Sequence, residues 1–115
     1  MKENTDCATF TEITFHDEVL NSEQPVLAVF EAGWSGTCDI MMPILKNLCL
    51  EYKGRVKIGM IDIDNNRELA ERYRIVNLPV LVFFSHGEIV DHIAGLVPKR
   101  EIVTKLDQLM SSNHE

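Results

Sequence analysis

Hydrophobic residues gather in short continuous runs, separated by segments in which they recur at helical spacing. Continuous runs of this length are typical of strands that are buried on both faces. We therefore predict three central strands, at Val26–Phe30, Val56–Ile63 and Val80–Phe84. A shorter strand is expected at Thr9–Ile13, and Ser85–Glu88 predicts a hairpin turn that returns through Ile89–Ala94.

Four other segments have the pattern of helices. Thr14, with an acid at Asp17, predicts a capped start of a short helix that runs to about Asn21. A long helix is predicted after position 38, kinked near Pro43, with inward residues Met41, Ile44, Leu45, Leu48 and Tyr52. The remaining helices are expected at Arg67–Tyr73 and Lys99–Ser111.

This alternation of strands and helices predicts an α/β fold with a central mixed sheet and helices on both faces. The length of 115 residues suits one domain. We place it at residues 9–112, between an N-terminal tail at 1–8 and a C-terminal tail at 113–115.

Composition and charge exclude several classes of protein. Apolar residues at 45% and charged residues at 25% match an ordinary globular protein. A net charge of −7 argues against a nucleic-acid partner, because there is no basic stripe to displace phosphate counterions. The longest apolar run, Pro79–Phe84, is too short to cross a bilayer, and no apolar run follows a positive N-terminal segment. We therefore expect a cytoplasmic protein without a membrane partner.

The three cysteines are Cys7, Cys38 and Cys49, an odd number without close pairing. We expect free thiols, with Cys49 as a buried small side chain and Cys7 as the thiol most accessible to reagents. Neither the cysteines nor the four histidines have the spacing of zinc ligands. No metal and no cofactor are predicted.

The segment Trp34-Ser-Gly-Thr-Cys38 and its surroundings resemble the thioredoxin family. Phe30–Cys38 is similar to the family's F-W-A-x-W-C-G-P-C, Pro43 stands at its helix kink, and Leu78-Pro79 stands at its Ile-Pro-Thr. The resemblance runs from about Phe10 to Met110 and implies a thioredoxin fold with a cis bond at Pro79, facing Cys38. It also implies a shallow polypeptide-binding groove, formed by Trp34, Gly36, Thr37, Leu78, Pro79, Gly95 and Leu96.

The chain departs from the family where the resemblance places the catalytic groups. Ser35 occupies the position of the attacking cysteine, and a hydroxyl that stays protonated at neutral pH cannot form the mixed disulfide. Cys38 remains at the position of the resolving, mostly buried cysteine. Thr37 replaces the motif proline. Val29 and Met60 stand where the family carries a buried aspartate and often a lysine.

Three functional hypotheses remain open. The first is a thioredoxin-family protein with impaired or absent dithiol–disulfide activity, which still binds a polypeptide or protein partner along the backbone at Leu78. The second is an oxidoreductase that acts through Cys38 as a single thiol. The third is a C-G-T-C thioredoxin in which Ser35 is an engineered replacement of the first cysteine. The oligomeric state is not predicted.

Overall fold

The computed structural model of this chain describes residues 7–113; the outer parts of both predicted tails, residues 1–6 and 114–115, lie outside the described residues. Strands and helices alternate in the predicted order. The elements are β1 (Ala8–Thr9), η1 (His16–Leu20), β2 (Val26–Glu31), α1 (Gly36–Glu51), β3 (Lys57–Asp62), α2 (Arg67–Arg72), β4 (Val80–Ser85), β5 (Glu88–Ala94) and α3 (Lys99–Asn113).

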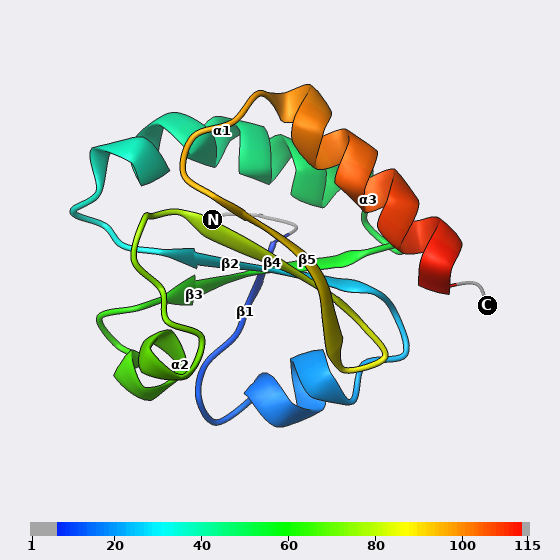
Figure 1. The fold of residues 1–115 in the computed structure, drawn as a ribbon, viewed down its shortest axis with the longest axis horizontal. Helices are drawn as coiled ribbons and strands as arrows, with labels where there is room; N and C mark the ends of the chain where they lie inside the picture. The colour runs from blue at the N-terminus through cyan, green and yellow to red at the C-terminus, as the bar shows by residue number, and fades with distance from the viewer. Residues whose placement is uncertain (1–6, 114–115) are drawn as a thin grey trace, which may run out of the picture.

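The strands form one mixed sheet in the order β1-β3-β2-β4-β5. β1, β3 and β2 are parallel, whereas β4 is antiparallel to both β2 and β5. The helices α1 and α3 cover one face of this sheet, and α2 and η1 lie against the other (Figure 1). The predicted fold class, a mixed sheet flanked by helices on both faces, is confirmed.

The central strand β2 shows why its sequence is apolar without interruption. Leu27 and Val29 belong to the core cluster that contains buried residues of α1 and α3. Val26, Ala28 and Phe30 belong to the second cluster, together with residues of η1 and α2. Both faces of β2 are therefore buried, and polar residues at alternate positions would have no contact with water.

The N-terminal strand β1 is shorter than the predicted strand at Thr9–Ile13. The Phe10 ring lies directly over Gly59 of β3, where any Cβ would overlap the ring. The chain then turns, with the Thr11 N–H donating to Thr14 Oγ1 at 2.9 Å. The predicted cap at Thr14 is absent: the N-cap residue is Phe15, and η1 begins without a side-chain cap as one short π-helical segment.

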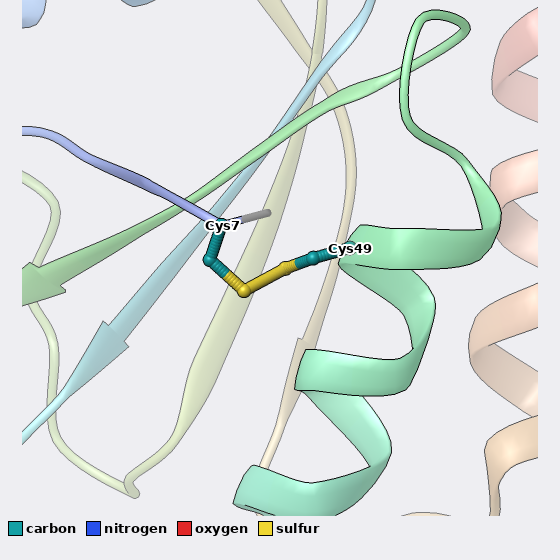
Figure 2. Close-up of a disulfide and its surroundings, with 2 residues drawn as sticks. All are labelled: Cys7 and Cys49. Carbon is teal, nitrogen blue, oxygen red and sulfur yellow. A yellow bond between two sulfur atoms is a disulfide. The ribbon is translucent and has the colours of Figure 1, made fainter. Parts of the chain in front are cut away.

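The prediction of free thiols is wrong for two of the three cysteines. Cys7 and Cys49 form a disulfide, with an S–S distance of 2.08 Å and a Cα–Cα distance of 5.1 Å. Figure 2 shows the bond connecting the chain just before β1 to the last turns of α1. The residues lie 42 positions apart in the sequence, and only the pairing of β1 with β3 beneath α1 brings them together.

Candidate functional site

The predicted groove residues come from three separate segments that meet at one edge of the sheet. β2 and β3 are parallel, and both end at this edge, in register at Glu31 and Asp62. The antiparallel β4 begins here, just after Pro79. The Gly95 N–H donates to the Pro79 carbonyl at 2.8 Å, which places the end of β5 beside the start of β4. α1 also begins at this edge, directly after the loop that follows β2.

Ser35 is the N-cap residue of α1. Its backbone is extended, with φ −91° and ψ 118°, and its Oγ accepts a hydrogen bond from the Cys38 N–H at 3.3 Å. This arrangement satisfies one of the backbone donors that a helix leaves unpaired in its first turn. Ser35 is also buried, with 7% of its surface exposed. Ser35, which stands at the position of the attacking cysteine, therefore serves as the N-cap of α1.

Cys38 lies in the first turn of α1 and faces the core. Its exposed fraction is 1%, and it is the one cysteine outside the disulfide. Thiol–disulfide exchange requires a sulfur that an incoming disulfide can reach in line. The folded loop exposes no such sulfur, because Cys38 is buried and Ser35, Gly36 and Thr37 contain none.

The pair of positions below the loop is apolar. Val29 of β2 and Met60 of β3 are direct neighbours in the parallel register, and Val29 is fully buried. Neither side chain can accept or release a proton. The positions at which the resemblance places an aspartate and a lysine therefore provide packing and no proton relay.

Trp34 is the most prominent apolar side chain at this edge. It is 68% exposed, and its Nε1–H donates to Asp64 Oδ2 at 2.9 Å, which fixes the orientation of the indole. Leu96 is 54% exposed, and Leu78 is half-buried. The peptide bond between Leu78 and Pro79 is cis, and Gly95 has a φ of 87°, a conformation that favours glycine.

Four carboxylates lie beside the loop, and the sequence analysis assigned none of them to the site. The pKa of Glu31 is raised, first by burial and then by the negative charges of Asp62, Asp39 and Asp64. Glu31 is the last residue of β2, and Asp62 is the last residue of the parallel strand β3. An acidic residue at the end of each of two predicted parallel strands was therefore a usable signal in the sequence.

Residues 7–113 contain neither a candidate metal site nor a candidate membrane span. No group of three or more His, Cys, Asp or Glu side chains is arranged there to hold a metal ion. No helix in that part of the chain is long and apolar enough to cross a membrane.

A mixed sheet between two helical layers, with the N-terminus of α1 at one edge, is the arrangement that the resemblance to thioredoxins implies. The family model described as Thioredoxin matches residues 6–108. The chain is 36% identical over 101 residues to Thioredoxin 1 of Nostoc sp., an alignment that covers 88% of this chain and 94% of that protein. It is 38% identical over 98 residues to Thioredoxin C-2 of Corynebacterium nephridii, covering 85% and 91% respectively. The chain belongs to the thioredoxin family.

Proposed function

We propose that this chain is a thioredoxin-family protein that binds a polypeptide at the sheet edge but does not perform rapid dithiol–disulfide exchange. The observation that carries the proposal is the state of the loop: Ser35 caps α1, and the remaining sulfur at Cys38 is 1% exposed. Thioredoxins act on protein disulfides through an attacking thiolate, and this loop presents none.

The absence of a proton relay supports the same proposal. Exchange through a dithiol requires that a proton leave the resolving thiol when it attacks the mixed disulfide. The contact between Val29 and Met60 provides no group that could take this proton. A serine substitution alone would leave such a group in place.

The groove itself does not depend on sulfur. Leu78 lies just before β4, outside the registered pairs of the sheet, with Trp34 and Leu96 exposed at the same edge. In the proposed mode, an extended segment of the partner forms hydrogen bonds to the backbone at Leu78 and places its side chains against Trp34 and Leu96. Gly36, Thr37 and Gly95 complete the proposed contact surface, whereas Pro79, the remaining predicted groove residue, is buried.

The proposed location is the cytoplasm. Most thiols are kept reduced in that compartment, so a Cys7–Cys49 disulfide that persists there would have to resist the cellular reducing systems. The proposed binding surface would function in either state, because both cysteines lie outside it.

Reduction of insulin disulfides tests the loss of activity. We expect the wild-type protein to match the background rate and Ser35→Cys to give turnover above it, because the variant restores a thiol at the N-terminus of α1. Ser35→Ala serves as the matched control and should stay at background. Wild-type turnover comparable to that of a C-G-P-C thioredoxin would contradict the proposal.

A further inference from the structure

Four carboxylates lie at the edge of the sheet that carries Trp34, and we call them the acidic rim: Glu31, Asp39, Asp62 and Asp64. Glu31 and Asp62 are register partners at the ends of β2 and β3. Asp64 accepts the indole hydrogen bond of Trp34, and Asp39 lies in the first turn of α1. The acidic rim therefore lies at the same sheet edge as the proposed groove.

No basic side chain of the chain pairs with the acidic rim among the described residues. The ion pairs there join Lys57 to Glu18, Lys99 to Glu51 and Lys105 to Asp91. No lysine or arginine occurs in residues 31–45 or 58–66, the two segments that carry the rim. Burial, and after it the negative charges of Asp62, Asp39 and Asp64, raise the pKa of Glu31. A partner could therefore supply the missing positive charge.

Exposed apolar side chains adjoin the acidic rim. Trp34 is 68% exposed, and Ile40, which follows Asp39 on α1, is 61% exposed. Arginine and lysine complement such a surface in two ways, since their heads pair with carboxylates and also stack over an indole ring. Their aliphatic stems cover apolar surface at the same time.

We propose that the groove binds an extended basic segment of a partner protein, in which lysine or arginine side chains face the acidic rim and an apolar neighbour packs against Trp34. This inference rests on the proposed function and specifies the partner of the same site. The net charge of −7 adds a longer-range attraction for such a partner and favours a high association rate at low salt.

Three synthetic peptides of equal length test the proposal. Each has the same apolar residues at alternate positions, and the others are all lysine, all glutamine or all glutamate. Trp34 is the only tryptophan of the chain, so its fluorescence reports binding at the groove without a label. At low salt we expect the lysine peptide to bind about tenfold more tightly than the glutamine peptide, the effect of one or two ion pairs at a partly exposed site. This advantage should disappear at about 1 M salt.

Matched variants separate the acidic rim from net charge. Glu31→Gln with Asp39→Asn should remove most of the advantage of the lysine peptide. Asp17→Asn with Glu23→Gln changes the net charge equally but at exposed positions in η1 and before β2, and it should retain the advantage. An equal loss in both double variants would overturn the proposal, because binding would then depend on overall charge.

The peptides also separate the preference for a basic segment from the existence of the polypeptide groove. If all three bind at Trp34 with equal affinity, the preference for a basic segment is wrong and the polypeptide groove stands. If the glutamate peptide binds best, the preference is likewise wrong. If no peptide changes the fluorescence of Trp34, the groove fails and the basic partner fails with it.

Discussion

Ser35 shows how much one atom changes at the start of α1. An oxygen at this position accepts the Cys38 N–H and stabilises the helix end, typically by ~1 kcal/mol relative to alanine. A sulfur is a much weaker acceptor but can be activated as a thiolate by the same helix end. The serine therefore has a structural role where a cysteine would have a chemical one.

Glu31 gives the chain a testable dependence on pH. Burial and three neighbouring aspartates raise its pKa above the ordinary value of 4.5, so the folded protein holds this proton at pH values where the unfolded chain has released it. Stability contributed by the proton is complete below pH 4.5 and falls as the pH rises through the folded pKa. We expect Glu31→Gln to match the wild type near pH 4 and to be the more stable protein at pH 7.

Urea unfolding at both pH values measures this difference. Glu23→Gln, a change of the same kind at an exposed residue before β2, should leave the difference between wild type and variant near zero at both values. A lower stability of Glu31→Gln at pH 7 would show that the carboxylate forms a favourable interaction, contrary to the direction of its pKa shift.

Strands and helices are predicted best from the sequence where burial alone determines their position. The continuous apolar run of β2 and the helical spacing of α3 follow from burial, and both elements occur where the pattern places them. β1 and η1 were less predictable. β1 ends where the Phe10 ring packs over Gly59, which is 49 positions away along the chain, and no local pattern records such a contact.

The disulfide between β1 and α1 was missed for the same reason. Spacing within the sequence detects cysteines that are close neighbours, whereas Cys7 and Cys49 are brought together by parallel pairing of β1 and β3. The odd number of cysteines favoured three free thiols, and this prediction is wrong for Cys7 and Cys49.

Reduction of this disulfide should destabilise the fold. A cross-link between residues 42 positions apart restricts the unfolded chain enough to contribute about 4 kcal/mol in the loop-entropy model, an upper value if the reduced chain retains structure. We expect dithiothreitol to lower the urea midpoint of the wild type. Cys7→Ser should unfold near the reduced midpoint whether or not dithiothreitol is present. Identical midpoints for oxidised and reduced wild type would contradict the bond.

The whole molecule assembles its candidate site at one sheet edge. Trp34, Leu78, Pro79 and Gly95 could be proposed from the sequence because each stands in a recognisable motif. For the acidic rim, the sequence shows acidic residues at the ends of two predicted strands but not that the four carboxylates lie near one another. Their proximity depends on the register of β2 with β3 and on the hydrogen bond between Asp64 and Trp34. Motifs thus locate the segments of a site, whereas sheet topology decides which other side chains surround them.

The burial of Cys38 predicts how fast the folded protein reacts with a thiol reagent. Cys38 lies in the first turn of α1 and is 1% exposed, so a thiol reagent can reach its sulfur only when the structure opens. Without reductant, we expect the native protein to react about a thousandfold or more slowly than the unfolded chain, the factor for an opening of ~4 kcal/mol.

Mass spectrometry of the labelled protein checks both the site and the number of thiols. The unfolded, unreduced chain should take up one label, on Cys38, and reduction should expose all three cysteines. Rapid labelling of Cys38 in the native state would show that its sulfur is accessible. That result would remove the main reason for placing non-covalent binding above single-thiol chemistry, because the loop would then offer a reactive sulfur at the entrance of the groove.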